Sequence, residues 1–228
     1  MNTMRQQSLM MTDRAGHRVP FFGVMGIVFA LAAIIGFAPN SVAILTGQKT
    51  NPPLIIHVHA AAMSSWMALL AIQAWLMGTG RAKLHMKLGL TALFLAPLVL
   101  GLMTAIFVLQ IQAGLTAPMI LLIQTKRLLG FAVCVGLALF WRKSRPEAHK
   151  RLLFLGTFAV LDAAFFRMGW LLPGYGHDNS FAVAHAYQLL LLVPFVVHDL
   201  RRLGRVHAVF LIGIPVLVAF EAAAAMTG

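Results

Sequence analysis

Seven long runs of apolar residues, separated by short gaps, constrain this chain more than any other feature of its sequence. The runs cover approximately residues 21–46, 54–78, 88–112, 118–141, 150–171, 182–200 and 207–227. Each is close to the ~20 residues that a helix needs to cross a bilayer. Backbone amides find no water in hydrocarbon, so such runs form helices, and none alternates as a barrel strand does. The sequence therefore predicts an all-α bundle of seven transmembrane helices.

The composition is that of a chain whose solvent is lipid. Of 228 residues, 60% are hydrophobic and 11% are charged, which is more apolar surface than one soluble core of this size can hide. The gaps are too short for a second domain, so we expect residues 1–228 to form a single transmembrane domain that begins with a basic segment at 1–19. The one cysteine, Cys134, lies inside an apolar run, which excludes an internal disulfide.

The basic residues are distributed asymmetrically along the chain. All but four of the 18 Lys and Arg residues lie in the N-terminal segment or at alternate gaps: Arg5, Arg14, Arg18, Arg81, Lys83, Lys87, Arg142, Lys143, Arg145, Lys150, Arg151, Arg201, Arg202 and Arg205. The other gaps carry only Lys49. Since Lys and Arg gather on the cytoplasmic side, the pattern predicts a cytoplasmic N-terminus and an external C-terminus.

The formal net charge of +12 therefore reflects topology and attraction to anionic lipid headgroups. No basic patch is interleaved with aromatic residues, so a nucleic acid is excluded as a partner.

Five charged residues lie within the apolar runs and more than two positions from either end: Lys126, Arg127, Asp162, Arg167 and Glu221. A charge in the apolar core costs at least ~2.5–3.5 kcal/mol, so such residues are normally paired, turned inward and candidates for function. We expect Asp162 close to the midplane and the other four in the outer half. A purely structural alternative pairs Arg127 with Glu221 and Arg167 with Asp162.

Three histidines lie at the same outer depth, and a fourth lies just above them. His57 and His59 begin the second run, His185 begins the sixth, and His177 lies on the loop above it. Residues two positions apart on a helix point to roughly opposite faces, so His57 and His59 do not both face the interior. We favour His59, which shares a face with Trp66.

Histidines at matching depth on parallel helices suit a b-type haem, which takes one axial imidazole from each side. His59 and His185 form an outer level pair, and His85 and His149 form an inner one. The leading interpretation is a membrane electron-transfer protein that binds one or two b-type haems and exchanges electrons with a quinone or a redox partner protein.

Small residues and cations near these histidines suit a porphyrin. Gly89 follows His85 and Gly156 lies on the face of His149, where a bulky side chain would fill the volume of the ring. Propionates need cationic partners. The candidates are Arg127 and Arg167 for an outer haem, and Arg81, Lys87 and Arg151 for an inner one.

The same residues allow other chemistry, and whether the protein is an enzyme stays open. His57, His59, His177 and His185, with a carboxylate, are ligand types for Zn or Cu and could serve an intramembrane hydrolase. The sequence has no HxxxH or HExxH pair to strengthen this reading. In a transporter, Lys126, Arg127 and Arg167 would bind an anion, or the carboxylates would relay protons. A structural subunit of a larger complex is the remaining alternative.

Two stretches carry a family resemblance. Residues 80–89, GRAKLHMKLG, and 145–152, RPEAHKRL, resemble the signatures of uncharacterised multi-pass bacterial membrane proteins with a Leu-His-Arg-Arg-Leu-Gly pattern. Met86-Lys87 stands where that pattern has Arg-Arg. The resemblance covers about half of the chain and implies a bacterial inner-membrane fold without an activity. It marks four signature positions: His59, His85, His149 and Arg167. A looser similarity to di-haem transmembrane cytochromes b rests on the level histidine pairs.

Overall fold

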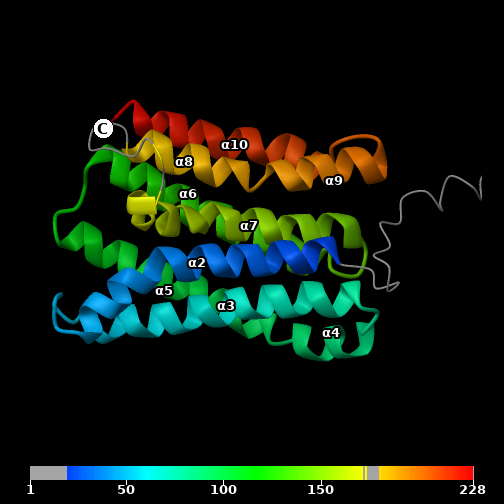
Figure 1. The fold of residues 1–228 in the computed structure, drawn as a ribbon, viewed down its shortest axis with the longest axis horizontal. Coiled ribbons are helices and arrows are strands. Elements are labelled where there is room, and N and C mark those ends of the chain that lie inside the picture. The colour runs from blue at the N-terminus through cyan, green and yellow to red at the C-terminus, as the bar shows by residue number, and fades with distance from the viewer. Residues whose placement is uncertain (1–19, 172, 174–179, 228) are drawn as a thin grey trace, which may run out of the picture.

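The computed structural model describes residues 20–171, 173 and 180–227. Every regular element in this part of the chain is a helix. The α-helices are α2 (Phe21–Leu45), α3 (Leu54–Gly78), α4 (Ala82–Gly89), α5 (Ala92–Gln112), α6 (Pro118–Phe140), α7 (Pro146–Arg167), α8 (Ser180–Leu190), α9 (Val193–Leu203) and α10 (Ala208–Ala225). The long helices lie alongside one another in an up-and-down bundle (Figure 1). The predicted all-α fold class is confirmed.

Six helical stretches in this described part are long and apolar enough to cross a bilayer. They are α2, α3, α5, α6, the α8–α9 stretch Phe181–Leu203, and α10. The chain is therefore a multi-pass membrane protein. Helix α7 has 22 residues, which is a similar length. It differs by carrying five charged residues, Glu147, Lys150, Arg151, Asp162 and Arg167.

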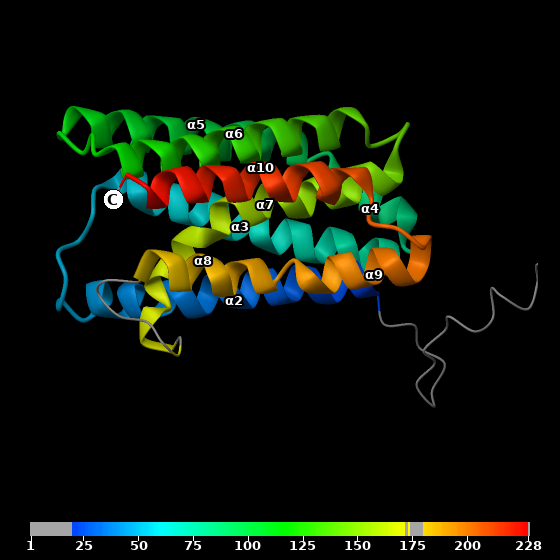
Figure 2. The same cartoon turned by 90° about the horizontal axis from the view of Figure 1, so that it is seen from above.

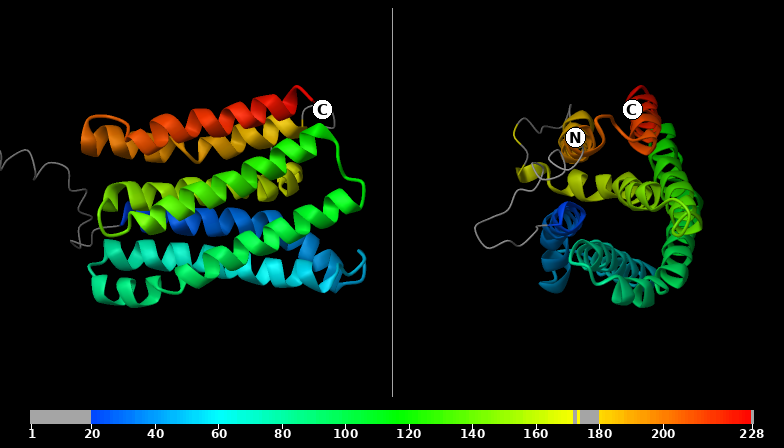
Figure 3. Two further views of the ribbon diagram at one scale, coloured as in Figure 1. Left: turned by 180° about the vertical axis from the view of Figure 1, so that it is seen from behind. Right: turned by 90° about the vertical axis from the view of Figure 1, so that its right-hand side faces the viewer.

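Helix α7 occupies the centre of the bundle. Fourteen of its 22 residues are buried, against three of 21 in α5. It contacts α2, α6, α8 and α10, and the end-on view in Figure 3 shows it between the α8–α10 group and the α2–α3 pair. Helix α5 lies at the margin beside α6 (Figure 2). Two of its charged residues, Arg151 and Asp162, are therefore surrounded by protein.

The two ends of the bundle differ in charge. Helix α4, the end of α9 and the start of α2 lie at one end, and the C-terminus lies at the other (Figure 1). We call the first the basic end, because its turns and short helices carry Arg81, Lys83, Lys87, Arg142, Lys143, Arg145, Arg201, Arg202 and Arg205. The opposite end holds the α2–α3 and α5–α6 connections.

Two predicted spans begin or break differently in the structure. The run expected at 88–112 is a short helix α4 followed by α5, which begins only at Ala92. The run expected at 182–200 is divided into α8 and α9 around residues 191–192. Pro194 explains the break, because proline has no amide hydrogen to continue the helical pattern and is tolerated in a first turn, where it lies in α9.

The span expected at 150–171 is also displaced. Helix α7 starts at Pro146 and ends at Arg167, and a short 3₁₀ helix, Gly169–Leu171, follows it. Proline is favoured in the first turn, where its missing amide hydrogen has no partner in any case. Asp162 therefore lies nearer the end of its helix than the sequence suggested.

Glycines bring the central helices into close contact. A side-chain carbon on Gly36 of α2 would lie 2.5 Å from the Ala164 carbonyl oxygen of α7. One on Gly130 of α6 would lie 2.7 Å from Ala159 Cβ of α7. Small residues permit such backbone approach between membrane helices, where packing rather than the hydrophobic effect drives association.

Candidate functional site

The main polar feature inside the bundle is an ion cluster that joins α6, α7 and α10. Lys126 Nζ donates to Asp162 Oδ2 at 2.8 Å and to Glu221 Oε1 at 3.0 Å. The side chains of Lys126 and Asp162 are each 1% exposed, and that of Glu221 is 7% exposed. One ammonium therefore holds two carboxylates from different helices with almost no surface open to solvent.

Helix α6 supplies a second cation at the next position. Arg127 Nε donates to Asp162 Oδ1 at 2.8 Å, and Arg127 Nη1 donates to Gln124 Oε1 at 2.6 Å. Gln124 donates in turn to Gln110 Oε1 of α5 at 2.6 Å. Two cations and two carboxylates cancel formally, which is the usual way in which charges are tolerated within a membrane.

His185 of α8 faces the same carboxylates without bonding to them. Its Nδ1 lies 2.8 Å from the Phe181 carbonyl oxygen, so Nδ1 carries a proton and donates it. Its Nε2 is buried, has no hydrogen-bond partner, and lies 3.7 Å from Glu221 Oε1 and 4.0 Å from Asp162 Oδ2. Phe166 and Phe181 pack against the ring, with centroids 5.1 and 4.2 Å away. The imidazole is thus held with one nitrogen aimed at two acids.

The cluster lies in the half of the bundle away from the basic end. At ~1.5 Å per residue, Lys126 is about 12 Å from the start of α6 and Asp162 about 8 Å from the end of α7. Glu221 is about 6 Å from the end of α10 by the same measure. Asp162 is thus not at the midplane of α7 but level with the rest of the cluster.

The ion pairs differ from those that the sequence suggested. Asp162 pairs with Lys126 and Arg127, and Glu221 pairs with Lys126. The pairs of the purely structural alternative, Arg127 with Glu221 and Arg167 with Asp162, are therefore not the ones that form. Arg167 is exposed, donates to the Ala163 carbonyl oxygen at 2.7 Å, and lies over the ring of Phe37 at 4.7 Å.

The outer histidines of α3 are not part of this cluster. His59 is half-buried with no partner at Nδ1, whereas His57 is exposed and its Nε2 lies 2.8 Å from Asn51 Oδ1. Helix α7 lies between α3 and α8 (Figure 3), so His59 and His185 are not arranged on two sides of one open slot. His177 lies outside the described residues. Within the described residues, no group of three or more His, Cys, Asp or Glu could hold a metal ion.

Both inner histidines place Nδ1 near a backbone carbonyl. His85 Nδ1 is 3.2 Å from the Gln73 carbonyl oxygen, and His149 Nδ1 is 2.8 Å from the Ala138 carbonyl oxygen. His85 is also close enough to act electrostatically on His149. Gly156, expected to leave room for a porphyrin, instead admits α6, since a side-chain carbon there would lie 2.9 Å from Val135 Cγ2.

A second buried ion pair, which the sequence did not indicate, lies toward the basic end. Arg151 Nε donates to both carboxylate oxygens of Asp199 at 3.0 and 3.1 Å, and Arg151 Nη2 also contacts Asp199 Oδ1. Arg151 Nη1 bonds the Glu147 carboxylate at 2.6 Å. Arg151 and Asp199 have no exposed surface, so Arg151 is not open to a haem propionate as we expected. Arg151 lies among the Lys and Arg residues of a predicted connection, so the sequence did not indicate that its side chain is buried and paired with Asp199.

The sequence did not point to three glutamines that bond between or within helices: Gln188, which is buried, and Gln110 and Gln124, which are partly buried. Gln188 donates to the Phe158 carbonyl oxygen at 2.7 Å, while its Oε1 is buried without a partner. An uncharged amide within an apolar run was the available signal, because such groups seek partners across membrane helices.

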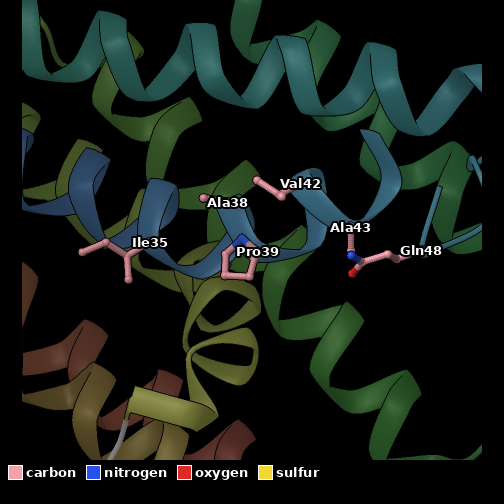
Figure 4. A pocket seen from close by; sticks show the side chains of 6 residues that line it. All are labelled: Ile35, Ala38, Pro39, Val42, Ala43 and Gln48. Carbon is pink, nitrogen blue, oxygen red and sulfur yellow. The ribbon is translucent and has the colours of Figure 1, made fainter. Parts of the chain in front are cut away.

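Two surface hollows lie along α2. One is lined by Ile35, Ala38, Pro39, Val42, Ala43 and Gln48 (Figure 4). Its walls are mostly apolar, and none of these six lining residues is ionisable.

Fold and site together define the class: an all-helical, multi-pass membrane protein with ion pairs in its interior. No protein-family model, curated protein or solved structure matches the chain.

Proposed function

We propose that this chain is a seven-span protein of a bacterial inner membrane that binds and releases protons at the Lys126, Asp162, Glu221 and His185 cluster, as a proton-coupled transporter does. The observation that carries the proposal is the position of His185 Nε2. It is buried, without a hydrogen-bond partner, and 3.7 to 4.0 Å from two carboxylates.

The proposed topology adds α7 to the six apolar spans and places the N-terminus in the cytoplasm. Helix α7 supports this because it is as long as the others and runs through the middle of them. The Lys and Arg residues of the basic end support the orientation, since short cytoplasmic connections are enriched in them. The cluster then lies toward the external leaflet. The resemblance to bacterial membrane proteins supports the location.

The chemistry follows from the ring of His185. With Nδ1–H bonded to the Phe181 carbonyl, the neutral ring presents the Nε2 lone pair to oxygen lone pairs of Asp162 and Glu221. When Nε2 is protonated, its N–H becomes a donor that faces two carboxylate acceptors. Closing the 3.7 Å separation to a charge-assisted bond requires a movement of about 1 Å.

Proton binding would also loosen the existing pairs. The cluster without His185 is formally neutral, with Lys126 and Arg127 against Asp162 and Glu221. An imidazolium that bonds Glu221 competes with Lys126 for that carboxylate. The proton therefore changes which of α8 and α6 holds α10, and this gives the site a way to couple protonation to helix movement.

The test is a titration of the full chain labelled with ¹⁵N-histidine in detergent micelles. We expect one histidine that starts as the Nδ1–H tautomer and gains a proton as the pH falls, and whose signals disappear in His185→Asn. The pH at which it titrates should shift in Glu221→Gln. The matched control is His57→Asn, which removes an exposed ring bonded only to Asn51.

Proton uptake by the protein in liposomes completes this test. A dye trapped inside should report faster acidification after an external pH drop with the wild type and His57→Asn than with His185→Asn. A His185 ring that keeps one protonation state throughout the titration would overturn the proposal, as would equal acidification with all three proteins.

Electron transfer through a b-type haem at the inner histidines is a second candidate. Histidines that bind a metal through one ring nitrogen usually donate the other N–H to a carbonyl or carboxylate. His85 and His149 both hold Nδ1 against a backbone carbonyl, which leaves Nε2 of each for an axial bond.

A visible spectrum tests this candidate. Protein made with haem available and purified in mild detergent should show a Soret band that shifts on reduction with dithionite. His149→Ala should lose the band and His185→Ala should keep it. A colourless wild type, or the reverse response of the two variants, would remove the inner pair as the haem site.

A further inference from the structure

A cationic hollow lies at the end of the bundle opposite the basic end. It is lined by Gly36, Pro39, Asn40 and Ala43 of α2, by Lys49 of the α2–α3 connection, and by Arg167 at the end of α7. Gly36 brings the two helices together here, because its backbone lies directly against Ala164 of α7. Two cations from distant parts of the sequence thereby border one space.

Both cations have donors to spare. Lys49 Nζ donates to Asn40 Oδ1 at 2.8 Å, and Arg167 Nη1 donates to the Ala163 carbonyl oxygen at 2.7 Å. Neither contacts a carboxylate within the described residues. An ammonium has three N–H groups and a guanidinium five, so each side chain retains donors for oxygens placed in the hollow. Arg127 and Asp162 are in electrostatic reach of Arg167, and their charges cancel formally.

An apolar hollow adjoins the cationic one. The hollow of Figure 4 shares Pro39 and Ala43 with it and continues along α2 over Ile35 and Val42. Pro39 interrupts the hydrogen bonding of α2 at this point. It has no amide hydrogen to donate to the carbonyl of Ile35, and its ring disturbs the preceding turn. Two cationic hydrogen-bond donors, Lys49 and Arg167, therefore lie next to an apolar hollow.

We propose that this hollow binds a phosphate group through Lys49 and Arg167. Arginine and lysine are the usual partners of phosphate oxygens, and such charge-assisted bonds are about twice as strong as neutral ones. A phospholipid headgroup would place its phosphate between the two cations and an acyl chain along the neighbouring apolar hollow. A free phosphate would use the cations alone.

The experiment measures binding of dioleoylphosphatidylglycerol and of inorganic phosphate to the full chain in detergent by native mass spectrometry. We expect one tightly bound phosphatidylglycerol per chain. Lys49→Gln and Arg167→Gln should each weaken it about tenfold, the effect of losing one charge-assisted contact. The matched control is Lys143→Gln, an exposed lysine at the basic end.

The arms separate the two sources of phosphate. A lipid is indicated if phosphatidylglycerol binds and millimolar inorganic phosphate does not displace it. Free phosphate is indicated if inorganic phosphate alone binds and is lost in the same two variants. Circular dichroism verifies that each variant is folded. Affinities for both ligands that are equal in the wild type, Lys49→Gln and Arg167→Gln would overturn the proposal.

Discussion

Lys126 and Asp162, 36 positions apart, are joined at 2.8 Å with 1% of each side chain exposed. The same ammonium also pairs with Glu221, whereas Asp162 has Arg127 as a second cation. The two carboxylates are therefore not equivalent. Losing Lys126 leaves Asp162 paired through Arg127 but leaves Glu221 facing only the uncharged side of His185.

This asymmetry predicts a rescue. Lys126→Met should lower the free energy of unfolding by about 3 kcal/mol, since it leaves a buried carboxylate without its cation. Adding Glu221→Gln should recover most of that loss, because no uncompensated charge remains. Thermal unfolding in detergent, followed by circular dichroism, measures both. If the double variant were as unstable as Lys126→Met, Glu221 would not depend on Lys126.

The Arg151–Asp199 pair predicts that position 151 requires the geometry of a guanidinium group and not only a positive charge. Arg151 bonds both Asp199 oxygens and the Glu147 carboxylate, and a lysine cannot reproduce that fork. Arg151→Lys should cost about 2 kcal/mol of unfolding free energy. The control is Arg202→Lys, an exposed residue 3.9 Å from Glu147, which should change stability little. Equal stability of the two variants would contradict this role.

How far the cluster could be predicted follows from its residue types. Lys126, Asp162 and Glu221 are conspicuous because ionisable residues within apolar runs are rare and costly. Their partners were not predictable in the same way. Pairing depends on how each helix is rotated and where it lies around the bundle, and in lipid the outer face is as apolar as the inner one, so the pattern carries little rotational information.

Arg167 illustrates the limit. The sequence places it inside the fifth apolar run, in the outer half, yet α7 ends at this residue and leaves its side chain exposed. The break between α8 and α9 had a signal in Pro194, and the central position of α7 had one in its many charges. Arg151 had none, since its neighbours in the sequence are the same basic residues that mark an ordinary cytoplasmic turn.

Two glycines of α6 predict opposite responses to the same substitution. A side-chain carbon at Gly130 would lie 2.7 Å from Ala159 Cβ, whereas at Gly136 nothing lies within 4 Å. Gly130→Ala should therefore destabilise the protein by about 1 to 3 kcal/mol through overpacking. Gly136→Ala should be neutral or stabilising by up to about 1 kcal/mol, since alanine favours the helix. The combination of Gly130→Ala with Ala159→Gly should restore stability, and its failure to do so would contradict the contact.

His207 predicts a pH dependence at the start of α10. Its Nδ1 accepts the Val209 amide at 3.2 Å, a role that requires an unprotonated nitrogen. Partial burial, and then the charge of Arg151, lower the pKa of His207 below its ordinary value of 6.5. As the pH falls, the unfolded chain therefore takes up the proton first, so the stability from this cap is present above pH 6.5 and is lost as the pH falls through the lowered pKa.

The variant His207→Asn tests this dependence, because it keeps an acceptor that does not titrate. Between neutral and acidic pH the wild type should lose up to about 1 kcal/mol relative to this variant, the worth of one helix cap. Thermal unfolding over a pH series measures this difference in stability. If the difference between the two proteins did not change with pH, His207 would not act in this way.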